Sequence, residues 1–367
     1  MVKARKAAAG AYRRSWLHGA PPPRWVRVLP VLLLVGVGVV ALTSSTPLDI
    51  GFLLGAVPPL AVLAYGPWAT ALLGAATIVL LTVPAFHLNR PGDTDLFTLG
   101  FVATLSIFVS FVRGRRDAQL DLERTVAETA QRAIVPEVSP RVGPVRCASL
   151  YRAAERGTLV GGDFFDVRAG PHGVRAVLGD VQGHGLSAVA TVASVLGAFR
   201  EAVLDDADAE SVAARLDRRL VVDSARTEHA ELFATAVLLD FAPHGREVRV
   251  LACGHPPPVL LRGATVHALE LDPGPPLGLG LADIMPGTAR TVSLMPGDRL
   301  LLASDGVLEA RDSSGTFYPF VERLERMTGI GPDRLPDEIW DDLIRFAPRI
   351  QDDVTLLILT FDGSGPP

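Results

Sequence analysis

The feature that most constrains the fold is a series of aspartates that stand next to glycines or to each other, at the ends of apolar, strand-like runs. Four such motifs occur in the second half of the chain: Gly161-Gly162-Asp163, Gly179-Asp180, Ser304-Asp305-Gly306 and Asp352-Asp353. A single Asp-Gly at a strand end is most often only a turn. Four motifs, each beside an apolar run, predict a fold that brings several strand ends together. Carboxylates gathered in this way favour hard divalent cations, so the first hypothesis is metal-assisted phosphate chemistry.

Charge and hydrophobicity divide the 367-residue chain into two parts. The mean hydropathy is +0.31, and the apolar excess lies towards the N-terminus. Residues 1–116 hold 11 Lys and Arg but only 3 Asp and Glu, whereas the remainder holds 24 and 37. The acidic second part argues against a nucleic-acid partner, which needs a basic face. The two cysteines, Cys147 and Cys253, form no disulfide framework and fit a reducing compartment.

Residues 28–112 predict a membrane region of about four transmembrane helices. Its apolar stretches are Val28–Leu42, Ile50–Tyr65, Trp68–Leu88 and Leu96–Val112. A spanning helix needs about 20 apolar residues; the third stretch fits best, and the second is short and contains two prolines. A buried soluble helical bundle is the alternative, but almost no charge interrupts the region. A cleaved signal peptide is also disfavoured, because the apolar pattern repeats.

Basic residues predict the orientation of these helices. Seven of them precede the first apolar stretch, within the N-terminal segment 1–27, and Arg113, Arg115 and Arg116 follow the last one. The two loops that would face outward carry only Arg90. The positive-inside rule therefore places both ends in the cytoplasm, which requires an even number of spans. We expect a multi-pass protein of the cell membrane whose N-terminus and C-terminal domain are cytoplasmic.

Residues 113–135 predict a connector helix that continues from the fourth apolar stretch. Leu122, Val126, Ala130 and Ile134 recur every four residues and would line one face, and Pro136 ends the pattern. Two interpretations stay open: the helix is a spacer, or it forms a homodimer with a second copy. One apolar face of about three turns is too short to decide between them.

Residues 136–361 are long enough for one domain with a sizeable core, and residues 362–367 form a tail. Short apolar runs predict strands at Val174–Gly179, Phe233–Leu239, Val248–Ala252, Val259–Leu261, Arg299–Ala303 and Val354–Phe361. Longer stretches predict helices at Leu186–Leu204, Ala209–Ser224, Phe320–Met327 and Asp337–Phe346. Tight turns join several strands where a parallel sheet would need crossover helices. The expected class is therefore α+β, with antiparallel sheets and helices outside them.

The motifs around the aspartates also resemble a known family. They are GGDFFDV (Gly161–Val167), GDVQGHG (Gly179–Gly185), FATAVLLD (Phe233–Asp240), CGHPPPVLL (Cys253–Leu261), PPLGL (Pro275–Leu279), SDGVLEAR (Ser304–Arg311) and QDDVTLLIL (Gln351–Leu359). In this order, over roughly residues 130–361, they resemble the bacterial SpoIIE-type branch of the metal-dependent PP2C/PPM serine/threonine protein phosphatases. The resemblance implies a sandwich of two antiparallel β-sheets flanked by helices, with two Mn²⁺ or Mg²⁺ ions at one edge. It also implies hydrolysis of phosphoserine or phosphothreonine on a protein by metal-activated water.

The resemblance implies unequal roles for the acidic residues. Asp180 bridges the two ions, and the backbone carbonyl of Val181 adds a ligand. Asp305 and Asp352 complete the site, and Asp180 and Asp305 are the residues on which catalysis depends. Asp163 binds a metal directly or through water. Asp353 is expected to support the ligands.

This sequence departs from the eukaryotic branch of the family after the bridging aspartate. That branch has a histidine two residues later, where Gln182 stands here, and His184 follows after two more residues. His184 is either the acid that protonates the leaving group or simply the residue before the next helix. No counterpart of the eukaryotic phosphate-binding arginine is evident, and Arg152 and Arg156 are candidates by proximity alone.

Family analogy suggests as substrate a phosphorylated anti-sigma-factor antagonist of the STAS type in a bacterial partner-switching pathway. Two other classes of function stay open. One is a catalytically weak, phosphatase-like signalling scaffold. The other is a nucleotide cyclase, because GGDFF resembles the GGD/EEF turn of diguanylate cyclases. Phe164 stands where that turn needs Glu, however, and a cyclase motif does not predict the later SDG and QDD.

Overall fold

The protein divides into two compact units, residues Met1–Leu122 and Glu123–Pro367. The computed structural model describes residues 24–43, 51–81, 93–134, 137–152, 161–183, 185–225, 232–243, 245–282, 284–350 and 352–363. The predicted N-terminal segment 1–27 thus falls almost wholly outside the described residues, as do residues 82–88 of the third apolar stretch.

The described residues of the first unit are helical where the apolar stretches occur. Its elements are α2 (Arg24–Thr43), the 3₁₀ segment η1 (Gly51–Ala56), α3 (Val57–Ala64), α4 (Pro67–Leu81) and the first part of α5 (Asp93–Ile134). The second apolar stretch is divided between η1 and α3. Its prolines, Pro58 and Pro59, lie in the first turn of α3, where a missing backbone N–H costs no hydrogen bond.

Among the described helices, only α6 (Leu186–Asp205) has the length and composition to cross a bilayer, and it is a core helix of the second unit. The apolar segments Trp25–Val40, Leu53–Ala64 and Pro67–Leu80 are shorter than a spanning helix. The multi-span membrane region therefore gains no support from these helix lengths, and it stays a prediction.

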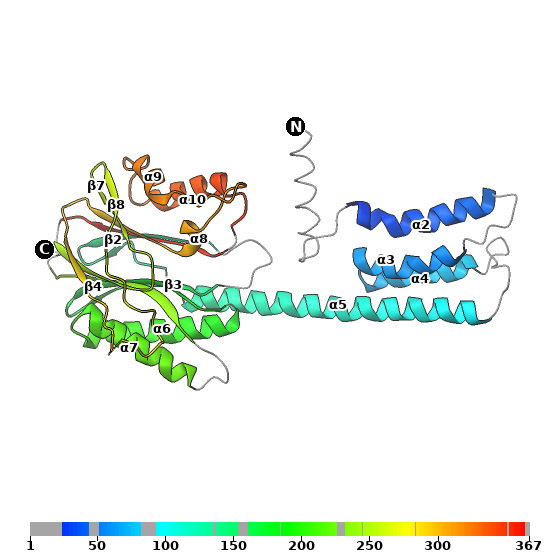
Figure 1. Ribbon diagram of the computed structural model, residues 1–367, viewed down its shortest axis with the longest axis horizontal. Coiled ribbons are helices and arrows are strands. Elements are labelled where there is room, and N and C mark those ends of the chain that lie inside the picture. Colours follow the sequence, from blue (N-terminus) through cyan, green and yellow to red (C-terminus); the bar gives the residue numbers. More distant parts are fainter. Residues whose placement is uncertain are drawn as a thin grey trace. The chain divides into compact units, whose positions relative to one another are not determined.

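The second unit is a sandwich of two antiparallel sheets with helices on both outer faces (Figure 1). One sheet has the order β1 (Arg141–Val142), β2 (Val145–Arg152), β11 (Val354–Phe361), β10 (Arg299–Ala303), β7 (Val259–Arg262), β8 (Thr265–Ala268). The other has the order β3 (Asp163–Gly170), β4 (Gly173–Val181), β5 (Ala234–Phe241), β6 (Glu247–Cys253), β9 (Arg290–Ser293). The expected α+β class and antiparallel sandwich are confirmed.

Helices α6 and α7 (Ala209–Ser224) cover the second sheet, and α8 (Asp305–Leu308), α9 (Phe320–Glu325) and α10 (Leu335–Phe346) cover the first (Figure 1). The sequence predicts all of these helices except α8. It does not predict strands β1, β2, β3, β8 and β9. Strands β8 and β9 are short and largely exposed, so they lack an apolar pattern.

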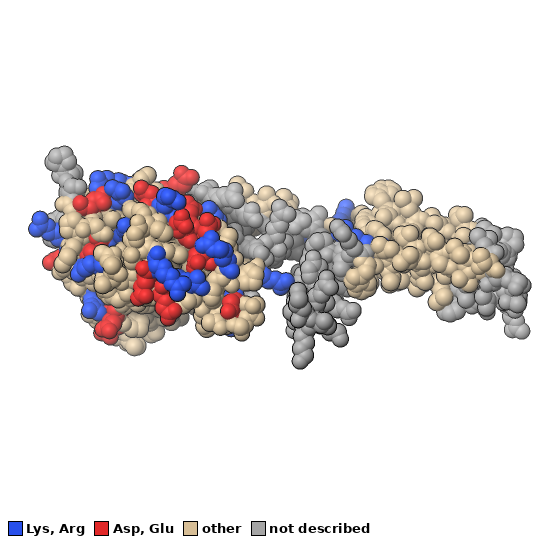
Figure 2. All heavy atoms as spheres, turned by 90° about the horizontal axis from the view of Figure 1, so that it is seen from above, with Lys and Arg blue, Asp and Glu red and all other residues tan. Residues whose placement is uncertain are grey.

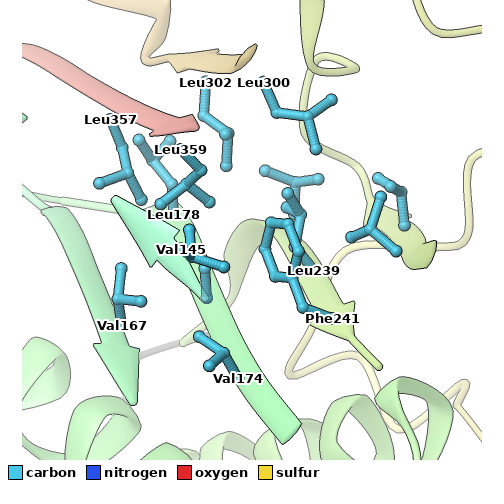
Figure 3. Packing of buried hydrophobic residues seen from close by; sticks show 14 of the residues in the cluster. Val145, Val167, Val174, Leu178, Leu239, Phe241, Leu300, Leu302, Leu357 and Leu359 are labelled. Atoms are coloured by element: carbon cyan, nitrogen blue, oxygen red, sulfur yellow. The ribbon is translucent and has the colours of Figure 1, made fainter. Parts of the chain in front are cut away.

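Strand β11 shows why the central strands have nearly continuous apolar sequences. All eight of its residues are buried, because each face of its sheet is covered. Leu357 and Leu359 point into the space between the sheets, where Leu178 and Leu239 of the other sheet meet them (Figure 3). Alternate residues such as Leu356 pack instead beneath α8–α10. The strand is thus shared by two hydrophobic cores.

The connector is the C-terminal part of the single helix α5. At its end, Ala130 and Ile134 pack against Val189 of α6, and Arg200 of α6 donates a hydrogen bond to the Ile134 carbonyl at 3.3 Å. The predicted apolar face is therefore only partly covered. Leu122 and Val126 are 65% and 47% exposed.

Candidate metal centre

The first two aspartate motifs meet across neighbouring strands. Asp163 begins β3 and lies directly opposite Asp180 near the end of β4. Asp163 is a buried strand residue with 3% of its surface exposed. Phe164 and Phe165 are both buried, on opposite faces of the sheet.

The other two motifs meet at one end of the first sheet. Strand β10 ends at Ala303, opposite Leu356 of β11, and the Ser304 N–H donates to the Thr355 carbonyl at 3.0 Å. Asp305 then opens α8, while Asp352 and Asp353 stand just before β11. Because the strands are antiparallel, the end of one and the start of the other share an edge of the sheet.

Two hydrogen bonds join these pairs of motifs across the sandwich. The Thr355 hydroxyl on β11 donates to the Asp163 carboxylate on β3. The Gly161 N–H, just before β3, donates to the Asp353 carboxylate at 3.2 Å. All four aspartate motifs therefore lie at the same edge of the sandwich, as the sequence pattern requires.

Asp352 and Asp353 differ sharply in environment. Asp353 is 3% exposed, and its carboxylate also accepts a hydrogen bond from the Tyr151 hydroxyl of β2. Its backbone carbonyl accepts one from the Ser304 hydroxyl at 3.1 Å. Asp352 is exposed at the surface of the site. The Asp352 carboxylate is therefore accessible, whereas the Asp353 carboxylate is occupied by hydrogen bonds that hold the surrounding segments together.

The electrostatics reflect carboxylates crowded into one edge. Burial raises the pKa of Asp163 well above its usual range, and the charge of Asp180 adds to this effect. Burial, followed by the charges of Asp305 and Asp352, raises the pKa of Asp180 to about 7. The pKa of Asp305 is also raised, first by burial and then by Asp352. Like charges that share a buried site oppose each other's ionisation, and bound cations would relieve that repulsion.

The donor chemistry of this edge fits hard divalent cations. Its donors are carboxylate oxygens and the Val181 carbonyl, the ligands that Mg²⁺ and Mn²⁺ prefer. A Cβ atom at Gly162 would lie 2.1 Å from the Val181 carbonyl oxygen and 2.6 Å from a carboxylate oxygen of Asp180. Only glycine leaves these two oxygens room. Within the described ranges, however, no three His, Cys, Asp or Glu side chains already stand in an arrangement that could hold an ion.

Of the two histidines in the motifs GDVQGHG and CGHPPPVLL, the structure describes only the second, His255. His184, the candidate acid, lies outside the described residues. His255 is 5% exposed, and its Nδ1 is 3.0 Å from the hydroxyl of Thr235 on β5. Burial lowers the pKa of His255 to about 4. This residue is therefore a neutral, buried part of the fold, and it contacts β5, whose Thr235 lies opposite Asp180 of β4.

The sequence motifs do not point to several residues that lie around the site. Tyr151 and Thr355 hold the carboxylates of Asp353 and Asp163 by hydrogen bonds. Thr355 could have been recognised from the sequence, because it is a polar residue in an otherwise apolar strand. Of the two arginines chosen by proximity, Arg156 lies outside the described residues. Arg152 is exposed, with its guanidinium 3.8 Å from Asp337.

A pocket of about 270 Å³ opens beside Asp305 and Asp352. Its lining residues are Asp305, Gly306, Glu309, Ala310, Arg311, Arg349 and Asp352. The pocket therefore combines two candidate metal ligands with two arginines from separate loops.

Solved structures share this architecture. The PP2C domain of SiaA from Pseudomonas aeruginosa superposes with a TM-score of 0.55 over 67% of this chain and 99% of its own, at 19% identity, which shows a common fold. The RsbU and RsbW domains of Rv1364c from Mycobacterium tuberculosis superpose with a TM-score of 0.52 at 27% identity, over 64% of each chain. The second unit thus has a PP2C-like fold.

Sequence comparison agrees. The phosphoserine phosphatase RsbP of Bacillus subtilis (strain 168) is 25% identical over 175 residues, which are 47% of this chain and 42% of RsbP. The chain thus spans less than half the length of this relative. The family model for Stage II sporulation protein E (SpoIIE) matches residues 170–362, more than half of the chain and three of the four aspartate motifs. This protein belongs to the SpoIIE family.

Proposed function

We propose that this protein is a metal-dependent phosphatase that hydrolyses phosphoserine or phosphothreonine on a protein. The observation that carries the proposal is the convergence of four separate aspartate motifs at one edge of a PP2C-like sandwich. Membership of the SpoIIE family and similarity to a phosphoserine phosphatase support the same activity.

In this proposal Asp180, Asp305, Asp352 and the Val181 carbonyl hold two Mn²⁺ or Mg²⁺ ions, with Asp163 beside them. Such ions, when bound, neutralise phosphate charge and make an attacking water more acidic. The chain's own residues orient the donors. Thr355 fixes the Asp163 carboxylate, and the bonds of Asp353 hold in place the segment that carries Asp352.

The proposed substrate is a phosphorylated anti-sigma-factor antagonist of the STAS type, in a bacterial partner-switching pathway. The mycobacterial structure that resembles this chain is named for RsbU and RsbW domains, and RsbP is named a phosphoserine phosphatase. These names belong to the relatives, and they support the pathway by analogy alone.

We also propose that residues 28–112 anchor the chain in the cell membrane, with the phosphatase domain in the cytoplasm. Large apolar side chains of α2–α5 are unusually exposed, among them Leu32 at 61%, Trp68 at 85%, Leu72 at 72% and Phe101 at 68%. On the face that Figure 2 shows, the described part of this unit has few charged side chains. Apolar surface of this extent needs lipid or protein to cover it. Retention in the membrane pellet after alkaline carbonate extraction supports an integral anchor, and release contradicts it.

The enzymatic test is Mn²⁺-dependent release of phosphate by the full-length chain, with p-nitrophenyl phosphate and a serine-phosphorylated STAS protein as substrates. We expect activity that EDTA abolishes and that Mn²⁺ restores. A folded chain that releases no phosphate from either substrate contradicts the proposal and favours a signalling scaffold. Conversion of GTP to a cyclic dinucleotide would favour the cyclase.

A further inference from the structure

The pocket beside Asp305 and Asp352 contains two arginines that the proposed metal chemistry does not use. Arg311 follows α8, and Arg349 lies in the loop between α10 and β11. Both side chains are exposed, and among the described residues neither guanidinium forms an ion pair. Other arginines of this unit are paired with acidic side chains, as Arg262 is with Asp298 at 2.6 Å and Arg249 with Glu210 at 2.6 Å. The pocket thus presents two cations that no carboxylate of the described residues pairs with, beside a cluster of aspartates.

Arg311 is held in place by its neighbours. Its guanidinium carbon lies 4.2 Å from the centre of the Phe317 ring, and the two residues form an isolated antiparallel bridge. The intervening turn is closed by Asp312, whose carboxylate accepts hydrogen bonds from the N–H groups of Ser314 and Thr316 at 2.8 and 3.0 Å. A guanidinium stacked on a ring keeps the N–H donors at its edge available.

Charge explains why such a site needs arginines. A phosphate monoester that enters this edge meets the carboxylates of Asp305 and Asp352, and Glu309 lines the same pocket. The carboxylates that bind the cations neutralise part of their positive charge. Part of the negative charge of the phosphate therefore stays uncompensated. A guanidinium fork pairs two N–H donors with two phosphate oxygens, which makes it well suited to supply the missing charge.

We propose that Arg311, pre-oriented by Phe317, binds the phosphate group of the substrate, and that Arg349 closes the other side of the same subsite. The inference rests on the proposed phosphatase function for the source of the phosphate. It concerns binding of a phosphate dianion, whether as a phosphoserine side chain or as the inorganic phosphate released from it.

The test compares Arg311→Ala, Arg311→Lys and Phe317→Leu with the unmodified full-length chain. Inorganic phosphate binding is measured by calorimetry in the presence of Mn²⁺, and KM and kcat are measured with a phosphoserine protein. We expect Arg311→Ala to weaken phosphate binding and raise KM by about tenfold or more, the loss typical of a charge-assisted hydrogen bond. Arg311→Lys keeps the positive charge but loses the paired N–H donors of the guanidinium. Phe317→Leu keeps the guanidinium but removes the ring on which it stacks. We expect both variants to have phosphate affinities and KM values between those of the unmodified chain and Arg311→Ala.

Two controls separate this role from a structural one. Arg326→Ala removes an exposed arginine at the end of α9 that does not line the pocket, and it should leave phosphate affinity unchanged. Mn²⁺ affinity should stay within about twofold in every Arg311 variant. Unchanged phosphate affinity in Arg311→Ala, or an equal loss of Mn²⁺ affinity, overturns the inference. If the unmodified chain hydrolyses nothing, the phosphatase proposal fails, and the phosphate-binding measurement still decides whether the subsite exists.

Discussion

The Thr355 hydroxyl of β11 donates a hydrogen bond to the Asp163 carboxylate of β3, and this bond joins the two sheets of the sandwich at the candidate metal centre. Both residues are buried. The Gly161–Asp353 bond makes a second connection between the same segments. The site is thus built by contacts between elements that are 192 residues apart in sequence. Its donors keep their positions only while the sheets stay packed.

The first prediction concerns the aspartates that carry the proposed chemistry. Asp180→Asn and Asp305→Asn remove one charge each without changing the side-chain shape. We expect phosphatase turnover to fall at least a hundredfold or so, because ligand charge is lost where phosphate charge is neutralised. Turnover and thermal unfolding are measured together. Asp341→Asn, on an exposed position of α10, is the matched control, and turnover near the unmodified value in either site variant would show that the ligand assignment is wrong.

The second prediction separates Asp352 from its neighbour. Asp352→Asn should lower Mn²⁺ affinity with little change in stability, since its side chain is exposed. Asp353→Asn should lower the free energy of unfolding by about 1–3 kcal/mol, because buried donors lose a charged acceptor. Tyr151→Phe should show a smaller loss of stability of the same kind. Equal losses of Mn²⁺ affinity in the two aspartate variants would refute this division of roles.

The third prediction uses the glycine beside the Val181 carbonyl. In Gly162→Ala the added Cβ would lie 2.1 Å from that oxygen, so the strand ends must move apart. We expect a loss of activity and a destabilisation of about 1–3 kcal/mol. Gly197→Ala is the opposite control: it lies inside α6 with nothing within 4 Å of the new Cβ, and should stabilise the chain by about 0.5–1 kcal/mol. Full activity in Gly162→Ala would contradict the role of this glycine in leaving room for the Val181 carbonyl.

The fourth prediction concerns the pH dependence of stability through His255. Its pKa is lowered from 6.5 to about 4, so between these values the unfolded chain binds a proton that the folded chain does not. Stability from this residue is complete above pH 6.5 and is lost as the pH falls towards 4, by at most about 3 kcal/mol. Urea unfolding of the unmodified chain and His255→Gln, compared at pH 7.5 and about 5, isolates this contribution. An equal pH response of the two would show that His255 is not the group responsible.

The fifth prediction decides between the two interpretations of the connector helix, a spacer or a homodimer with a second copy, and takes the homodimer as the expected outcome. Val126 lies on the exposed part of the apolar face of α5, so Val126→Cys should form an intermolecular disulfide in intact membranes under mild oxidation. The native thiols should not interfere, because burial raises the pKa of Cys147 and of Cys253 to about 12. Arg124→Cys, roughly 160° around the helix, is the control and should cross-link poorly. Equal cross-linking at both positions would argue against a specific helix pair.

The sequence alone determined the class of fold and the identity of the candidate ligands. Strands β4, β5, β6, β10 and β11 can be predicted from the sequence because they are covered on both faces, and a strand buried in this way is apolar at nearly every position. The aspartates of the site can be recognised in the sequence because they interrupt these apolar runs. Each is a charged residue at the boundary of such a run, and the fold can place it only at a sheet edge.

Tertiary structure alone decided how those residues divide their roles. Asp352 and Asp353 are adjacent and chemically identical, yet one is exposed and the other is bound to Tyr151 and Gly161. Arg311 and Arg349 belong to separate loops that meet only in the folded domain. Strand pairing and burial depend on partners far away in the chain, so local sequence patterns can name the residues of this site but cannot assign their partners, their exposure or their pKa values.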